Sequence, residues 1–175
     1  MKAGHVARRV ILGRDEAELA AAARVQVAEL ARQESIEVAL LIFPSVTSGP
    51  DAFDAWCAPL RAADPAFVAA VFHPECAYDL STPAQAVGFF RRAPDPTLQL
   101  VRVDVLERVR GSDGKFLFDF SAAAWAELAR RERRLPPSER IARDNHALLG
   151  ARAGELVAIY DDIAADRARS YGRGG

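Results

Sequence analysis

A histidine and a short run of arginines are the residues of this chain whose types and spacing could support chemistry. His73 ends an apolar run that begins at Ala66, and the proline-rich segment 91–102 downstream carries three arginines. Ligands of open α/β sheets bind at the carboxyl ends of the strands, which is the place that this pattern gives to His73. We therefore expect His73 to be a catalytic acid or base, a role that histidine fills near neutral pH. The alternative is that its imidazole bonds to carbonyls of the loop that follows.

The arginines predict the second wall of the same site. Arg92 and Arg102 could form a fork that binds a carboxylate or a phosphate. If the segment after Pro96 is helical, Gln99 and Arg102 are three residues apart and share a face. We expect Arg92, Gln99 and Arg102 to bind an anionic metabolite opposite His73. The alternative is that the arginines anchor the loop through salt bridges.

Metal and cofactor motifs are incomplete in this sequence. His73-Pro74-Glu75 is similar to the H-x-E motif of zinc deaminases, which also needs a downstream P-C-x-x-C that this chain lacks. Cys76 stands too close to the motif for chelation, so we expect no metal, although a site combining His73 with His146 or His5 stays open. Phosphate-loop, dinucleotide-loop and G-x-S-x-G motifs are also absent from the sequence, and we expect no cofactor.

Composition narrows the class of protein. The chain has 175 residues, half of them apolar, which suits one domain with a full core. A net charge of -1 gives no global field that would attract nucleic acid or an anionic membrane. The sequence holds no run of 18 apolar residues, and its two cysteines suit a reducing compartment. We expect a cytoplasmic protein that binds neither nucleic acid nor membrane.

The first half of the chain alternates between strand and helix patterns. Residues 6–12 predict a strand near a sheet edge, because Arg8 and Arg9 interrupt it. Asp15 to Glu18 resembles a capping box ahead of a helix, and residues 53–60 predict a second helix with Cys57 in its apolar stripe. Runs 38–43 and 66–72 are apolar on both faces, as strands covered on both sides are. The β-α-β-α-β order predicts an α/β fold with a mainly parallel sheet of three to five strands flanked by helices, and a helical C-terminal third.

The second half is less regular. Residues 74–94 predict a loop of roughly 20 residues, longer than compact domains usually hold without a function. The spacing of Leu98, Val101 and Val105 predicts a helix over 95–109, and a strand over 98–103 is the alternative. We further expect a short strand at 116–118 and helices over 121–134, 138–149 and 153–169. We expect residues 1–150 to form one α/β domain, 151–170 a C-terminal helix and 171–175 a disordered tail.

Asn145 is the remaining candidate for the binding site. Ile141 and Leu148 place it on the expected buried face of its helix, where an amide needs hydrogen-bond partners. It could bind the ligand, and the alternative is a structural bond to the long loop.

The order of motifs from about residue 5 to residue 150 resembles a bacterial family, domain of unknown function 1415. The matching motifs are Phe72-His73-Pro74, the segment Pro94-Asp95-Pro96-Thr97-Leu98-Gln99-Leu100-Val101-Arg102, and Ile141 with Asn145. The chain departs from the family at Arg91-Arg92-Ala93, where the family has Asn-Arg-Ser, and at Gln99, where it has His. No residues here match the family's Leu-Cys-Pro-Phe segment. The resemblance brings no established activity with it.

Two functions of different class follow from these patterns. The first is a small-molecule enzyme or accessory biosynthetic protein that holds an anionic metabolite in a His/Arg pocket. The alternative is a non-catalytic interaction module that docks through residues 153–169 on a partner protein or on a second copy. That helix carries an apolar stripe formed by Leu156, Ile159, Tyr160 and Ile163.

Overall fold

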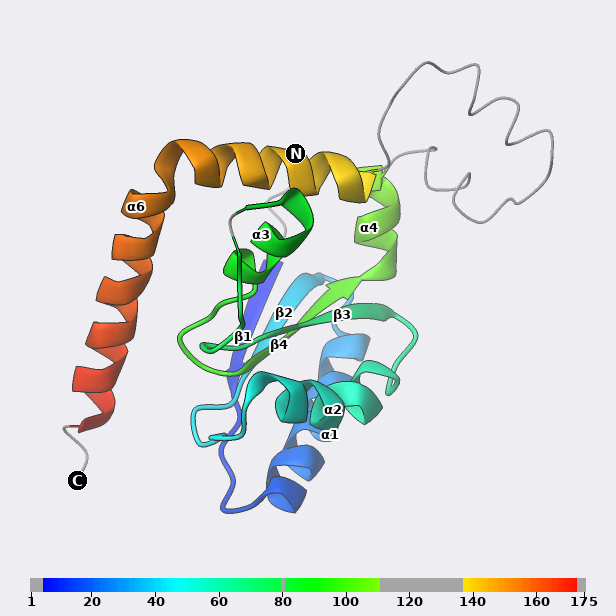
Figure 1. Cartoon of the computed structure of the whole chain (residues 1–175). Coiled ribbons are helices and arrows are strands. Elements are labelled where there is room, and N and C mark those ends of the chain that lie inside the picture. Colours follow the sequence, from blue (N-terminus) through cyan, green and yellow to red (C-terminus); the bar gives the residue numbers. More distant parts are fainter. Residues whose placement is uncertain (1–4, 80, 111–136, 173–175) are drawn as a thin grey trace, which may run out of the picture.

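The computed structural model describes residues 5–79, 81–110 and 137–172, which form a mixed sheet flanked by helices (Figure 1). In chain order the elements are β1 (His5–Val10), α1 (Glu16–Arg32), β2 (Ile36–Ile42), α2 (Pro50–Arg61), β3 (Phe67–Phe72), α3 (Pro83–Phe90), β4 (Thr97–Arg102), α4 (Val103–Arg110) and α6 (Pro137–Gly172). The α/β class, the number of strands and the helical C-terminal segment agree with the sequence pattern. The predicted strand at 116–118 and helix at 121–134 lie outside the described residues.

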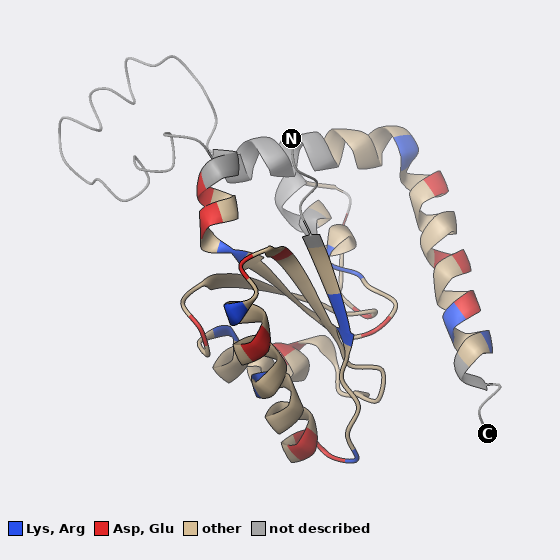
Figure 2. Ribbon diagram, turned by 180° about the vertical axis from the view of Figure 1, so that it is seen from behind, with Lys and Arg blue, Asp and Glu red and all other residues tan. Residues whose placement is uncertain are grey.

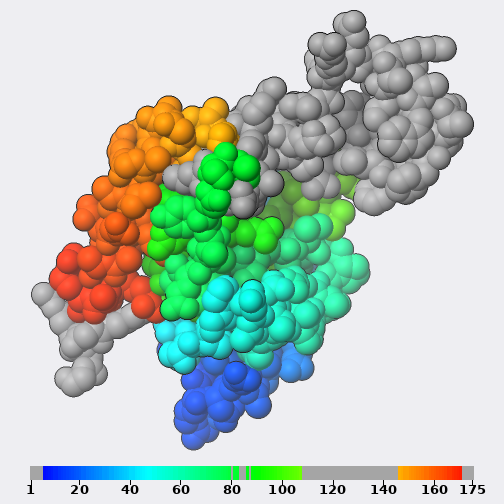
Figure 3. Space-filling view, viewed as in Figure 1, coloured from blue at the N-terminus to red at the C-terminus, as the bar shows by residue number. Residues whose placement is uncertain are grey.

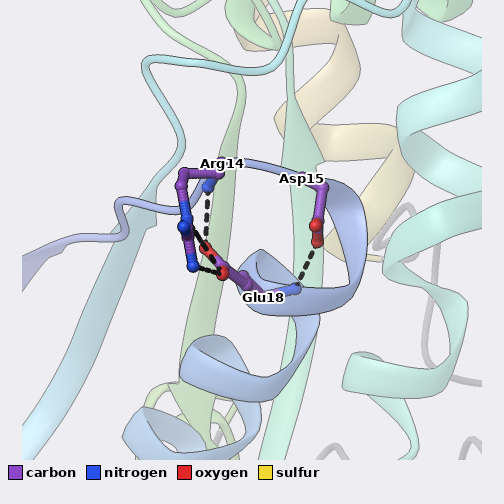
Figure 4. A network of polar contacts seen from close by, with 3 residues as sticks. All are labelled: Arg14, Asp15 and Glu18. Carbon is purple, nitrogen blue, oxygen red and sulfur yellow. Dashed lines mark hydrogen bonds and ion pairs between the residues drawn. The ribbon is translucent and has the colours of Figure 1, made fainter.

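Helix α1 begins with the capping arrangement that the sequence indicates (Figure 4). Asp15 is the N-cap, and its Oδ1 accepts a hydrogen bond of 2.9 Å from the Glu18 amide. The Glu18 carboxylate reaches back to the amide and guanidinium of Arg14, one residue earlier than a standard capping box would place the contact. These bonds fix where the chain leaves β1 and enters the helix.

The sheet has the order β1-β2-β4-β3, and its strand directions correct the prediction of a mainly parallel sheet. β1 and β2 are parallel, whereas β4 is antiparallel to both of its neighbours, β2 and β3. The three strands of the β-α-β-α-β pattern therefore do point the same way. The difference arises because a fourth strand is inserted between the second and the third in the opposite direction.

That fourth strand occupies residues for which the sequence spacing favours a helix. Leu98 and Val101 fit helical spacing, but Leu98, Leu100 and Arg102 also alternate, and these three side chains are the buried ones on one face of β4. A central position satisfies the backbone of β4 on both sides through the β2 and β3 ladders. The helical part of the predicted segment is confined to α4, which follows at Val103.

One face of the sheet holds the main core. Helices α1 and α2 lie together against this face (Figure 1), with Val27 and Leu30 of α1 and Phe53 and Cys57 of α2 in the same buried cluster as Leu41. The rings of Phe43, Phe53 and Trp56 pack with centroids 5.2 to 5.9 Å apart. The predicted apolar stripe around Cys57 is therefore confirmed, with Trp56 partly buried beside it.

The opposite face of the sheet is apolar but only partly covered. We call it the open face, and the strand registers define it by the rows Val6–Val38–Val101–Val68, Arg8–Leu40–Gln99–Ala70 and Val10–Ile42–Thr97–Phe72. Val6, Val10 and Val68 keep about half of their surface exposed, and most of the other residues are half-buried. Strands that the sequence presents as apolar on both sides are thus fully covered on one side only.

Helices α3 and α6 form a second, smaller core. Ala86 and Phe89 of α3 and Leu149 of α6 are buried together, with Leu156 and Val157 packed against them. Leu149, rather than the exposed Leu148 that the sequence pattern favoured, faces this core. Helix α3 lies within residues 74–94, which corrects the prediction of one long loop.

Helix α6 joins the two C-terminal helices that the sequence predicts, and the chain kinks at Arg152, between Gly150 and Gly154. The half after the kink lies alongside the green segment that contains α3 (Figures 1 and 3). The helix continues to Gly172, past the predicted start of the tail at 171, and residues 173–175 lie outside the description. None of the described helices is both long enough and apolar enough to cross a membrane.

Candidate functional site

His73 stands at the end of β3, as the sequence predicts, but both of its ring nitrogens already have partners. Nδ1 accepts a hydrogen bond of 3.1 Å from the Glu75 amide, so Nε2 carries the proton and donates to the Ser48 carbonyl at 2.9 Å. The side chain is 3 % exposed and packs near the ring of Phe53. The imidazole therefore links the loop after β2 to the turn after β3, and its carbonyl partner precedes His73 in the chain instead of lying in the loop that follows it.

Arg102 is bound even more completely. Its Nη2 donates to the carbonyls of Leu30, Ala31 and Gln33 at 2.9 to 3.0 Å, and its Nε donates to the Ile36 carbonyl at 2.7 Å. Carbonyls at the end of a helix lack partners within the helix, and a cation there also complements the helix dipole. Arg102 therefore closes the carboxyl end of α1 and the turn into β2.

The structure does not bring His73 and Arg102 into one cleft. In the antiparallel β3–β4 register Phe72 pairs with Thr97, whereas Arg102 pairs with Phe67. Five residues of register amount to about 17 Å along the strands. The prediction of a shared His/Arg pocket is therefore wrong. Because residues 97–102 form a strand and not the predicted helix, Arg102 lies at the opposite end of the strands from His73.

Arg92 lies in the segment between β3 and β4 that follows His73, but its side chain faces helix α6. Its Nε donates to the Pro74 carbonyl at 3.1 Å, and its guanidinium stands 3.8 Å from the centre of the Tyr160 ring and 5.2 Å from that of Tyr78. The Tyr160 hydroxyl donates to the carbonyls of Pro74 and Ala93 at 3.2 and 3.3 Å. Burial raises the pKa of Tyr160, and the neighbouring Arg92 lowers it in part.

Gln99 is the predicted site residue that lines a hollow. The hollow lies on the open face and has a volume of about 320 Å³. Its lining comes from β2, β3, β4 and the segment before β4, and consists of Leu40, Ile42, Phe72, Ala93, Pro94, Asp95, Thr97 and Gln99. The sequence patterns did not identify the apolar residues of this lining as site residues. The alternative strand interpretation of this segment places Thr97 and Gln99 on one face.

Asp95 forms the charged part of the wall of this hollow. Its Oδ1 accepts a hydrogen bond of 2.7 Å from Nε of Arg167, in the last part of α6. The Asp95 side chain is 14 % exposed. The sequence pattern places Asp95 at the start of the predicted helix over 95–109, whereas in the structure it joins α6 to the margin of the open face.

The other sequence candidates stand apart from the hollow or outside the description. The backbone of Asn145 belongs to α6, and its side chain lies outside the described residues. Glu75 is exposed, and Cys76 is a half-buried free thiol. Within the described part of the chain, histidine, cysteine and carboxylate side chains form no group of three that could hold a metal ion.

Comparison of the chain with protein-family models, with curated protein sequences and with solved structures gives no match. The geometry of the described residues therefore carries the functional argument.

Proposed function

We propose that this protein is a binding protein that takes up a small, largely apolar molecule at Gln99 on the open face of its sheet. The observation that carries the proposal is the hollow of about 320 Å³ on a sheet face that stays half-exposed. Ligand sites in proteins are concave, mostly apolar and equipped with few polar groups, and volumes begin near 300 Å³. The hollow has this composition.

The lining also indicates the chemistry of the ligand. Leu40, Ile42 and Phe72 would cover an apolar body, and the Gln99 amide can both donate and accept at one point. Asp95 adds a carboxylate that is already paired with Arg167, so it favours a hydrogen-bond donor over a second anion. We infer a ligand with an apolar body and one neutral or cationic hydrogen-bonding end, in place of the anionic metabolite expected from the arginines.

Binding is favoured over catalysis because the groups expected to do chemistry are occupied. The ring nitrogens of His73 and the guanidinium of Arg102 form their hydrogen bonds with backbone groups. Among the described residues that line the hollow, Asp95 is the one ionisable side chain, and the Thr97 hydroxyl beside it donates a hydrogen bond of 2.9 Å to the Asp95 backbone carbonyl.

Location and family belong to this proposal as well. The two free cysteines, Cys57 and Cys76, fit a reducing compartment such as the cytoplasm. We propose membership of the domain of unknown function 1415 family from the motifs at 72–74 and 94–102 and from Ile141 with Asn145, and this adds no activity to the proposal.

Ligand-observed NMR with a set of small alcohols, amides and amines, each with its matched carboxylate, tests the proposal. We expect saturation transfer from the protein to the neutral and amine members, and its loss in Leu40→Arg, which fills the hollow. The matched control is Val68→Arg, which places the same charge on the same face outside the hollow. Gln99→Leu should weaken binding of the amides about tenfold.

Equal loss of signal in Leu40→Arg and Val68→Arg would show that binding is not at the hollow and would overturn the proposal. A preference for the carboxylates that disappears in Arg102→Ala would support the anionic-metabolite function instead.

The second candidate function is the interaction module that docks through residues 153–169. A specific observation favours it: Ile159 and Ile163 keep 48 % and 45 % of their surface exposed, whereas Leu156 and Tyr160 of the same stripe face the domain. A mass measurement in solution that finds an assembly in the wild type and a monomer in Ile159→Glu/Ile163→Glu would support this candidate.

A further inference from the structure

The outer strand β1 combines a free edge with basic charge. Within the described part of the chain, β1 is hydrogen-bonded to β2 only. Its residues Arg8 and Arg9 form no ion pair with any described side chain, and the single hydrogen bond of their guanidinium groups runs from Arg9 to the Arg8 carbonyl. The basic stretch is visible as the blue part of β1 in Figure 2. An exposed apolar side chain stands on either side of it, Val6 at 55 % and Val10 at 59 %.

Strand geometry shows which backbone groups of β1 are free. The Ile11 amide donates to the Ile42 carbonyl at 2.8 Å, so the backbone of Ile11 faces β2. Because successive residues of a strand face opposite sides, the amides and carbonyls of Val6, Arg8 and Val10 point away from β2. These outward groups can pair with one more strand.

We propose that the free edge of β1 binds an extended acidic segment of a partner protein, which adds to the sheet as a fifth strand. Main-chain hydrogen bonds hold such a segment, and side-chain contacts select it. Arg8 and Arg9 point to opposite faces of the sheet, so two consecutive acidic residues of the segment meet one arginine each. Flanking apolar residues then cover Val6 and Val10.

Charge argues against a second copy of this chain as the occupant. Antiparallel pairing of β1 with β1 of another molecule would set the arginines of one strand near those of the other, and like charges across strands are destabilising. The other outer strand, β3, carries no charged residue between Phe67 and Phe72, so it offers no such selection.

The test uses two capped peptides, TVEEVT and TVKKVT, titrated into the full-length ¹⁵N-labelled protein. We expect TVEEVT to shift the NMR signals of the β1 amides. It should bind about tenfold more tightly than TVKKVT, because each exposed cross-strand charge pair contributes only modestly to the binding free energy. The double variant Arg8→Glu/Arg9→Glu should reverse the preference. Val10→Pro removes an outward amide without changing the charge, and it should weaken TVEEVT binding relative to Val10→Ala.

Three results would overturn the proposal. If neither peptide shifts the NMR signals of the β1 amides, or if both peptides bind equally tightly, the arginines serve only to prevent other strands from pairing with this edge. If the protein alone forms a dimer that Val10→Pro dissociates, a second copy occupies the edge. The experiment is independent of the small-molecule proposal, because Leu40→Arg, which fills the hollow, leaves the outward backbone of β1 unchanged.

Discussion

The guanidinium of Arg92 stacks on the ring of Tyr160 at 3.8 Å, and this contact fastens helix α6 to the segment between β3 and β4. The Tyr160 hydroxyl adds bonds to the carbonyls of Pro74 and Ala93 on the same segment. Asp95 and Arg167 form an ion pair further along the helix. The position of the residues at the margin of the open face therefore depends on how α6 packs against them.

Tyr160→Phe should lower the free energy of unfolding by about 1 kcal/mol, the typical net value of a hydrogen bond. Burial raises the pKa of Tyr160 in the folded state, so its contribution is fully present below the ordinary tyrosine pKa of about 10 and is lost as pH rises through the folded value. Urea unfolding between pH 8 and pH 11 measures both effects. A wild type and a Tyr160→Phe variant that lose stability in parallel above pH 10 would contradict the assignment.

Arg102→Ala should destabilise the protein by about 2–4 kcal/mol, because three backbone carbonyls at the end of α1 and one at the start of β2 each lose a charged donor. Arg102→Lys should recover part of this loss, since an ammonium group keeps the charge but cannot span the same carbonyls. Chemical denaturation of the three proteins gives the order. A thermal-shift series in sulfate and phosphate adds a control: a stabilisation of the wild type that Arg102→Lys abolishes would mean that the guanidinium binds an anion.

Cys57 should not react with thiol reagents in the native protein at pH 8. Its side chain is fully buried, and burial raises its pKa to about 12, which leaves almost no thiolate. Cys57→Ser should cost about 1–3 kcal/mol, because a hydroxyl is buried among apolar groups. Thiol titration before and after unfolding checks the first statement, with Cys76→Ala as the background in which Cys57 is the sole thiol. Rapid native labelling in that background would place Cys57 outside the core.

Gly88→Ala should destabilise the protein by about 1–3 kcal/mol, since a methyl group in α3 would stand 2.1 Å from the Ala77 carbonyl oxygen and force the backbone apart. Gly150→Ala is the matched control within α6. No atom lies within 4 Å of its added carbon, so the better helix propensity of alanine should stabilise the protein by about 0.5–1 kcal/mol. Thermal unfolding that shows the same sign for both variants would refute the close approach of α3 to residue 77.

Local sequence patterns determined a large part of this fold. The capping residues Asp15 and Glu18 start α1, the alternation and charges of β1 mark an outer strand, and the apolar stripe through Cys57 marks the buried side of α2. The break in the C-terminal helices falls between Gly150 and Gly154. Such features depend on residues within a few positions of each other, so they can be read without knowledge of the fold.

Only the tertiary structure decided that residues 97–102 form a strand and not a helix, and which roles the residues around them have. Helical and alternating spacing both fit this segment, and the choice depended on free edges of β2 and β3 that lie far away in sequence. That choice sent Arg102 to the end of α1, about 70 residues distant in the chain, and left Gln99 on the open face. His73 likewise found Ser48, 25 residues earlier. A buried polar group bonds to whichever partner the assembled fold places beside it, and a sequence alone does not contain that placement.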